Sequence, residues 1–97
     1  MTLTAASLLL AGCAGKDPVM QLADKVFDLA KVQYTEMEKA LGPDEFPKCT
    51  DSEGRLVSTN VGWWGSGFHP GSLWYVYEYT GDETFRELAW KYTGKLE

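Results

Sequence analysis

Basic residues are scarce in this sequence, which has nine Lys or Arg against fourteen Asp or Glu and a net charge of −5. No cluster of Lys and Arg occurs, so the phosphate backbone of a nucleic acid would be repelled rather than neutralised. Histidine occurs once, at His69, and one histidine cannot supply a metal site or a catalytic triad. These shortages exclude nucleic acid as a partner, and we expect no metal and no cofactor.

Long hydrophobic runs are also missing. The run from Ala5 to Ala11 is too short to span a bilayer as a helix, and it is typical of the apolar part of an export signal. It leads into Leu10-Ala11-Gly12-Cys13, which resembles the lipobox of bacterial lipoproteins, where cleavage precedes a cysteine that becomes diacylated. The interpretation is a signal peptide over residues 1–12, lipidation at Cys13, and a tether over 13–17. The alternative is a short apolar strand or helix with a buried cysteine.

That interpretation predicts where the protein is found. A lipid on Cys13 would attach an exported chain to a membrane of the bacterial envelope, on the periplasmic side or at the cell surface. With Cys13 lipidated, Cys49 would stand alone, so we expect no disulfide between the two.

Apolar residues recur at three- and four-residue steps along much of the chain, which predicts amphipathic helices. Asp17 followed by Pro18 is typical of a helix start, and Gly42 followed by Pro43 is typical of a stop. The segment between Gly42 and the next stripe has no sustained periodicity, so we expect a long loop with room for one short extended piece. The fold class predicted is all-α, with helices over 18–41, 70–79 and 82–97 and a loop over 42–62.

Aromatic residues are concentrated after Gly62, and they divide into two groups. Trp63, Trp64 and Phe68 stand in a Gly-rich loop with no helical stripe to join. Rings in such a loop can stack on the C–H face of a sugar, while attached polar groups bind its hydroxyls. The rings on helical stripes are expected to pack in a core: Trp74, Tyr77, Phe85 and Tyr92.

The polar residues do not assemble a catalytic set. His69 is predicted to be a hydrogen-bonded structural histidine, and Cys49 a plain thiol, because no base lies near it in the sequence. The acidic residues of the loop have no spacing that imposes a shared geometry, so they are expected to be solvated. They are Asp44, Glu45, Asp51 and Glu53.

One stretch carries a resemblance to a known family. The pattern Trp64-x-Ser66-Gly67-Phe68-x-Pro70-Gly71-x-Leu73-Trp74-x-x-Tyr77-x-x-Thr80-Gly81-Asp82 closely resembles the N-terminal signature of the unsaturated glucuronyl hydrolases, glycoside hydrolase family 88. The resemblance covers about Asp24 to the end of the chain. It implies that residues 18–97 are the first part of an (α/α)6 barrel, whose remaining helices would follow Glu97.

The family resemblance also implies an activity. Its members remove the 4,5-unsaturated uronic acid that polysaccharide lyases leave on oligosaccharides: an aspartic acid protonates the double bond, water adds, and the hemiketal opens. Carried over by position, Trp64 and Phe68 would line the pocket for this sugar. His69 departs from the aromatic residue that is more usual there. The two catalytic aspartates of the family lie in later loops, so no catalytic residue is assigned within this chain.

Two alternatives are left open. An unsaturated rhamnogalacturonyl hydrolase has the same barrel and acts on a different substrate. A small, non-catalytic sugar-binding lipoprotein of the envelope could use Trp63, Trp64 and Phe68 as a platform. If the barrel interpretation holds, the 97-residue chain by itself is expected to be inactive and only marginally folded, because its helices would lack their partners.

Overall fold

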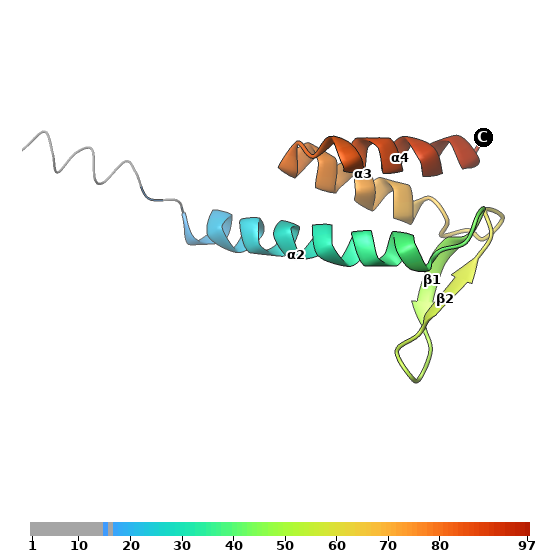
Figure 1. The fold of residues 1–97 in the computed structure, drawn as a ribbon. Coiled ribbons are helices and arrows are strands. Elements are labelled where there is room, and N and C mark those ends of the chain that lie inside the picture. Colours follow the sequence, from blue (N-terminus) through green and yellow to red (C-terminus); the bar gives the residue numbers. More distant parts are fainter. Residues whose placement is uncertain (1–14, 16) are drawn as a thin grey trace, which may run out of the picture.

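The computed structural model describes residue 15 and residues 17–97 of the chain. The described residues form three helices and one small sheet, in the order α2, β1, β2, α3 and α4 (Figure 1). The mostly helical architecture agrees with the predicted all-α class. The predicted signal peptide, Cys13 and most of the tether lie outside the described residues. None of the helices described is long and apolar enough to cross a membrane.

Helix α2 spans Pro18–Ala40, which confirms the first predicted helix. Its start follows from the predicted cap, because the Asp17 carboxylate accepts a hydrogen bond from the Val19 N–H at 2.8 Å and proline fills the first helical position. Leu41 adopts an extended conformation and ends the helix.

The segment after α2 is a β-hairpin rather than a long loop, which corrects the prediction for residues 42–62. Strand β1 spans Phe46–Thr50 and pairs antiparallel with β2, Leu56–Thr59. The connection is organised by Asp51, whose carboxylate accepts hydrogen bonds from the N–H groups of Glu53 and Arg55, both at 2.9 Å. Strands of four and five residues with a single buried side chain, Phe46, show too little alternation to be recognised in the sequence.

Helices α3, Phe68–Thr80, and α4, Glu83–Lys95, form an antiparallel pair that lies along α2, with the hairpin at the C-terminal end of α2 (Figure 1). Helix α3 begins two residues earlier than predicted. Asp82 caps α4 as expected, accepting a hydrogen bond from the Thr84 N–H at 3.0 Å. The turn between the helices depends on Gly81, which has a φ of 71° and donates its N–H to the Tyr77 carbonyl at 2.7 Å.

The core lies between α3, α4 and the first residue of β1. Tyr92 and Phe46 meet edge to face, with ring centroids 5.4 Å apart. Trp74 and Tyr77 are half-buried against this core, and the Trp74 indole donates a hydrogen bond to the Thr93 hydroxyl at 3.0 Å. The predicted packing of the four helical rings is therefore confirmed. The buried hydrophobic residues that form this core cluster are Phe46, Leu73, Val76, Phe85, Ala89 and Tyr92.

Helix α2 touches the α3–α4 pair with only one side. Phe27 stacks on Tyr79 with centroids 4.0 Å apart, and Glu38 accepts a hydrogen bond from the Tyr92 hydroxyl at 2.6 Å. No residue of α2 is fully buried. A second set of apolar side chains on this helix faces solvent: Val19, Leu22, Val26, Leu29 and Val32.

Gly81→Ala is expected to destabilise the fold by about 1 kcal/mol, because a residue with a Cβ is strained at positive φ. An added Cβ at this position has nothing within 4 Å to strike, so the cost comes from the backbone alone. The midpoint of urea unfolding, followed by circular dichroism, measures the change.

A matched control is Gly71→Ala in α3, where an added Cβ also has open space and the backbone is helical. There alanine is expected to stabilise by about 0.5 kcal/mol. Equal shifts for the two variants would contradict a conformational role for Gly81.

Candidate functional site

The turn that precedes α3 is built by hydrogen bonds within residues 60–68. The Ser66 N–H donates to the Trp63 carbonyl at 3.0 Å, and the buried Ser66 hydroxyl donates to the Val61 carbonyl at 2.9 Å. The Trp63 ring folds back over Gly65, where an added Cβ would meet ring carbons at 2.7 Å. Trp63 can lie in this position because Gly65 has no side chain.

Trp64 and Phe68, the two predicted sugar contacts, are brought together on the surface. They are 83% and 69% exposed, and their rings meet edge to face with centroids 6.1 Å apart. With Gly67 they line a hollow of about 250 Å³. Phe68 is the first residue of α3 rather than a loop residue, so the helix fixes its position. Two exposed rings beside a glycine form a surface on which a flat ligand can stack.

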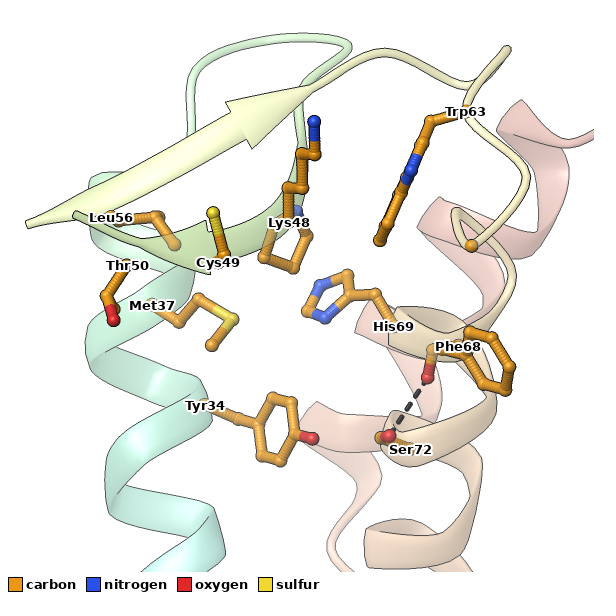
Figure 2. A pocket seen from close by; sticks show the side chains of 12 residues that line it. Tyr34, Met37, Lys48, Cys49, Thr50, Leu56, Trp63, Phe68, His69 and Ser72 are labelled. Carbon is orange, nitrogen blue, oxygen red and sulfur yellow. Dashed lines mark hydrogen bonds between the residues drawn. The ribbon is translucent and has the colours of Figure 1, made fainter.

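A larger pocket of about 440 Å³ lies between α2, the hairpin and the start of α3 (Figure 2). Trp63 faces this pocket, with the Lys48 ammonium 5.9 Å from its ring centroid. Phe68 borders both this pocket and the hollow beside Trp64. The residues that line the pocket are Tyr34, Met37, Pro47, Lys48, Cys49, Thr50, Leu56, Trp63, Gly65, Phe68, His69 and Ser72.

His69 extends from α3 into this pocket region (Figure 2). The side chain is buried, with 6% exposed, and its ring contacts Tyr92 edge to face at a centroid distance of 4.5 Å. Neither ring nitrogen has a hydrogen-bond partner among the residues that the structure describes, so the prediction of a hydrogen-bonded histidine is wrong. Burial lowers the pKa of the imidazole to about 4, while Glu38 raises it and Lys91 lowers it further. The ring is therefore neutral at neutral pH.

The acidic residues between α2 and the second strand are bonded within the chain. Asp44 pairs with Lys95 at 3.1 Å, and Glu45 accepts a hydrogen bond from the Gly42 N–H at 2.8 Å. Asp51 organises the hairpin and pairs with Arg55, as Glu53 also does. Asp44 and Glu53 have side chains that are 89% and 68% exposed, so these two are solvated as expected. Asp51 and Glu45 differ from the expectation, because each accepts backbone hydrogen bonds that hold local structure.

Cys49 is a free, exposed thiol on β1 that lines the larger pocket. Within residues 17–97, no group of three or more His, Cys, Asp or Glu side chains could hold a metal ion. The larger pocket itself was missed in the sequence, because it depends on the hairpin that carries Lys48 and Cys49 against α2. In the sequence, the hairpin residues that line this pocket show no spacing pattern that would indicate a binding site.

The comparisons with known proteins find a similarity over part of the chain. One similar protein is the unsaturated glucuronyl hydrolase of Bacillus sp. (strain GL1), which is 46% identical over 46 residues. That stretch is 47% of this chain and 12% of the relative, so the chain matches only a small part of the relative's length. No protein-family model and no solved structure matches the chain.

Proposed function

We propose that this chain is the N-terminal part of an unsaturated glucuronyl hydrolase, which removes 4,5-unsaturated uronic acid from oligosaccharides made by polysaccharide lyases. The observation that carries the proposal is the 46% identity over 46 residues to a protein of that name. The exposed pair Trp64 and Phe68 supports it, because aromatic faces bind the C–H faces of sugars.

The proposal includes a larger helical assembly. An (α/α)6 barrel would cover the apolar side of α2 that faces solvent, which includes Val19, Leu22 and Val26. Exposed apolar stripes of this kind are covered by other elements in most soluble proteins. In the proposed reaction, an aspartic acid beyond residue 97 protonates the double bond, water adds at the neighbouring carbon, and the hemiketal opens. The part played by residues 17–97 is to bind and orient the sugar.

Expression of the whole gene and an assay on an unsaturated uronyl disaccharide test this function. Hydration removes the double bond conjugated to the carboxylate, so the ultraviolet absorbance of the substrate is expected to fall while the second sugar is released. Turnover of unsaturated rhamnogalacturonyl disaccharides alone would assign the related activity instead. An absorbance that stays constant with both substrates would contradict the proposal.

Trp64→Ala is expected to lower kcat/KM for the unsaturated disaccharide at least about tenfold, which corresponds to roughly 1.4 kcal/mol of binding lost in the transition state. The ring is exposed, so its removal has little effect on the core, and the midpoint of thermal unfolding should change by less than about 2 °C. Steady-state kinetics on the whole protein measure the first effect.

The control is Tyr75→Ala in α3. The Tyr75 ring is also exposed, but it borders neither the pocket nor the hollow. Its kcat/KM should match that of the wild type. If Trp64→Ala and Tyr75→Ala behave alike, the aromatic pair has no part in binding the sugar.

We also propose that the protein is a lipoprotein of the bacterial envelope, anchored through Cys13. The support is the sequence Leu10-Ala11-Gly12-Cys13 after an apolar run. Cys13→Ser is expected to move the protein from the membrane fraction to the soluble fraction or to leave it unprocessed, and to abolish incorporation of labelled fatty acid. Cys49→Ser, at the exposed thiol, should change neither. Labelling that persists in Cys13→Ser would contradict the anchor.

A further inference from the structure

Ser66 is a buried polar residue in the turn that carries the exposed aromatic pair. Its side chain is 6% exposed, and a buried hydroxyl destabilises a fold unless it is hydrogen-bonded. Here the hydroxyl donates to the Val61 carbonyl at 2.9 Å. An alanine would fill nearly the same space without a polar group to bury, so packing alone does not require a serine. What the serine adds is the bond to Val61, which closes the turn.

Trp64 depends on the backbone of this turn for its position. The ring is 83% exposed, so the core does not hold it. Before it in the chain, the Trp63 carbonyl accepts a hydrogen bond from the Ser66 N–H at 3.0 Å. After it, the Gly65 carbonyl accepts one from the Phe68 N–H at 3.1 Å. Because the residues on both sides are held in this way, the shape of the turn sets the direction in which the Trp64 ring points.

Phe68, the other ring of the pair, is positioned by a different element. It is the first residue of α3, and the two residues that follow it in the helix, His69 and Pro70, are buried. Its location therefore follows from the helix, whereas that of Trp64 follows from the turn. The two rings meet edge to face with centroids 6.1 Å apart. A change in the turn would therefore alter the surface that the two rings form together.

We propose that Ser66 is a positioning residue, whose hydroxyl holds the turn so that Trp64 stands at a fixed angle to Phe68 before a sugar arrives. The inference rests on the proposed function and gives a buried side chain a part in it. A surface that is ordered in advance loses less conformational entropy when a ligand binds, and its affinity is higher for that reason. Without the hydroxyl, the Trp64 ring samples several directions, and binding has to select one of them.

Ser66→Ala tests this role in the whole protein. The variant is expected to lower kcat/KM for the unsaturated uronyl disaccharide about fivefold, which is less than the loss expected for Trp64→Ala. The matched control is Thr35→Ala. It also removes a hydroxyl that donates to a backbone carbonyl, here at 2.7 Å, but it lies in α2. Its kcat/KM should equal that of the wild type.

A double-mutant cycle separates positioning from a general loss of stability. If Ser66 acts through Trp64, Ser66→Ala should lower kcat/KM by less than about 1.5-fold in a protein that already carries Trp64→Ala. Its effect on the midpoint of thermal unfolding should be the same in both backgrounds, since the bond to Val61 is lost in each. A loss of kcat/KM that persists at full size without the Trp64 ring would overturn the positioning role.

Asn60 provides an independent variant at an exposed position of the same turn. Its side-chain oxygen accepts a hydrogen bond from the Gly62 N–H at 2.9 Å. Asn60→Ala removes this bond without opening the core, and it should lower kcat/KM about threefold. Asn60→Asp keeps an acceptor oxygen and should restore the wild-type value. Equal kcat/KM values for Asn60→Ala and Asn60→Asp would contradict a role of the turn in binding.

The position of the Trp64 ring can also be followed without turnover. In protein labelled with fluorotryptophan, the fluorine resonance of Trp64 is the one that is missing from Trp64→Phe. Ser66→Ala is expected to shift or broaden this resonance and to leave that of Trp90, in α4, unchanged. An unchanged Trp64 resonance would overturn the positioning role alone. A resonance that shifts in a protein whose wild type turns over no disaccharide would overturn the proposed function instead, while the turn would still position the ring.

Discussion

Tyr92→Ala is expected to destabilise the protein by about 3–5 kcal/mol, the range for removing a buried aromatic ring. Tyr92 is the largest of the fully buried side chains. Its ring contacts Phe46 from the hairpin and His69 from α3, and its hydroxyl donates to Glu38 of α2. This side chain of α4 therefore contacts α2, strand β1 and α3. Because the total stability of a small domain is about 5–15 kcal/mol, this variant is expected to leave little folded protein at 37 °C.

Tyr92→Phe separates the ring from the hydroxyl. It keeps the packing and loses one hydrogen bond to a charged acceptor, so the expected cost is about 1–2 kcal/mol. Urea unfolding followed by circular dichroism compares the two variants. Similar losses for Tyr92→Ala and Tyr92→Phe would show that the hydroxyl and not the ring holds the elements together, contrary to the core described above.

The free energy of unfolding is expected to fall by on the order of 2–3 kcal/mol as the pH decreases from 7 to 4, because of His69. Burial lowers the pKa of the folded imidazole from 6.5 to about 4. Between these values the unfolded chain binds a proton that the folded protein does not, so acid favours unfolding. The contribution is fully present above pH 6.5, declines as the pH falls, and is gone below about 4.

Several other groups near His69 affect this titration. Glu38 favours the charged imidazole and Lys91 disfavours it, while the rings of Tyr34 and Tyr92 pack against the histidine. Carboxylates elsewhere also titrate in acid, and the pKa of Asp51 is lowered chiefly by hydrogen bonding to the Arg55 backbone. A control variant therefore has to separate the contribution of His69 to the pH dependence from that of the carboxylates.

His69→Phe is that control, because it removes the titrating ring and keeps the carboxylates. The slope of unfolding free energy against pH between 4.5 and 6.5 should be markedly smaller in this variant. Identical slopes in the two proteins would contradict the lowered pKa of His69. Measurement of the histidine ring protons by NMR across the same range gives the pKa of the folded state directly.

The helices were predictable because their ends are encoded locally. The Asp17-Pro18 start of α2, the Gly81 turn and the Asp82 cap all act within a few residues. The apolar stripe of α4 identified Tyr92 and Phe85 as core. The hairpin was not predictable from periodicity, since only Phe46 of its strands is buried. Because the hairpin was not predicted, the larger pocket was not predicted either. The hairpin places Lys48, which lines that pocket, near Trp63.

The environment of His69 could not be predicted for a different reason. Burial and hydrogen bonding of a single polar residue depend on side chains from α2 and α4 that are distant in the sequence, here Tyr34 and Tyr92. Trp64 and Phe68, by contrast, were identified as loop aromatics near a helix start, and the structure places their rings together and exposed. Their contact with a sugar stays a prediction.

The most direct test of the proposed function compares an unsaturated uronyl disaccharide with the same disaccharide whose 4,5 double bond has been reduced. The protein expressed from the whole gene is incubated with each, and release of the second sugar is measured by chromatography. If the reaction is hydration of the double bond, only the unsaturated compound is cleaved. Cleavage of both compounds at similar rates, or of neither, would contradict it.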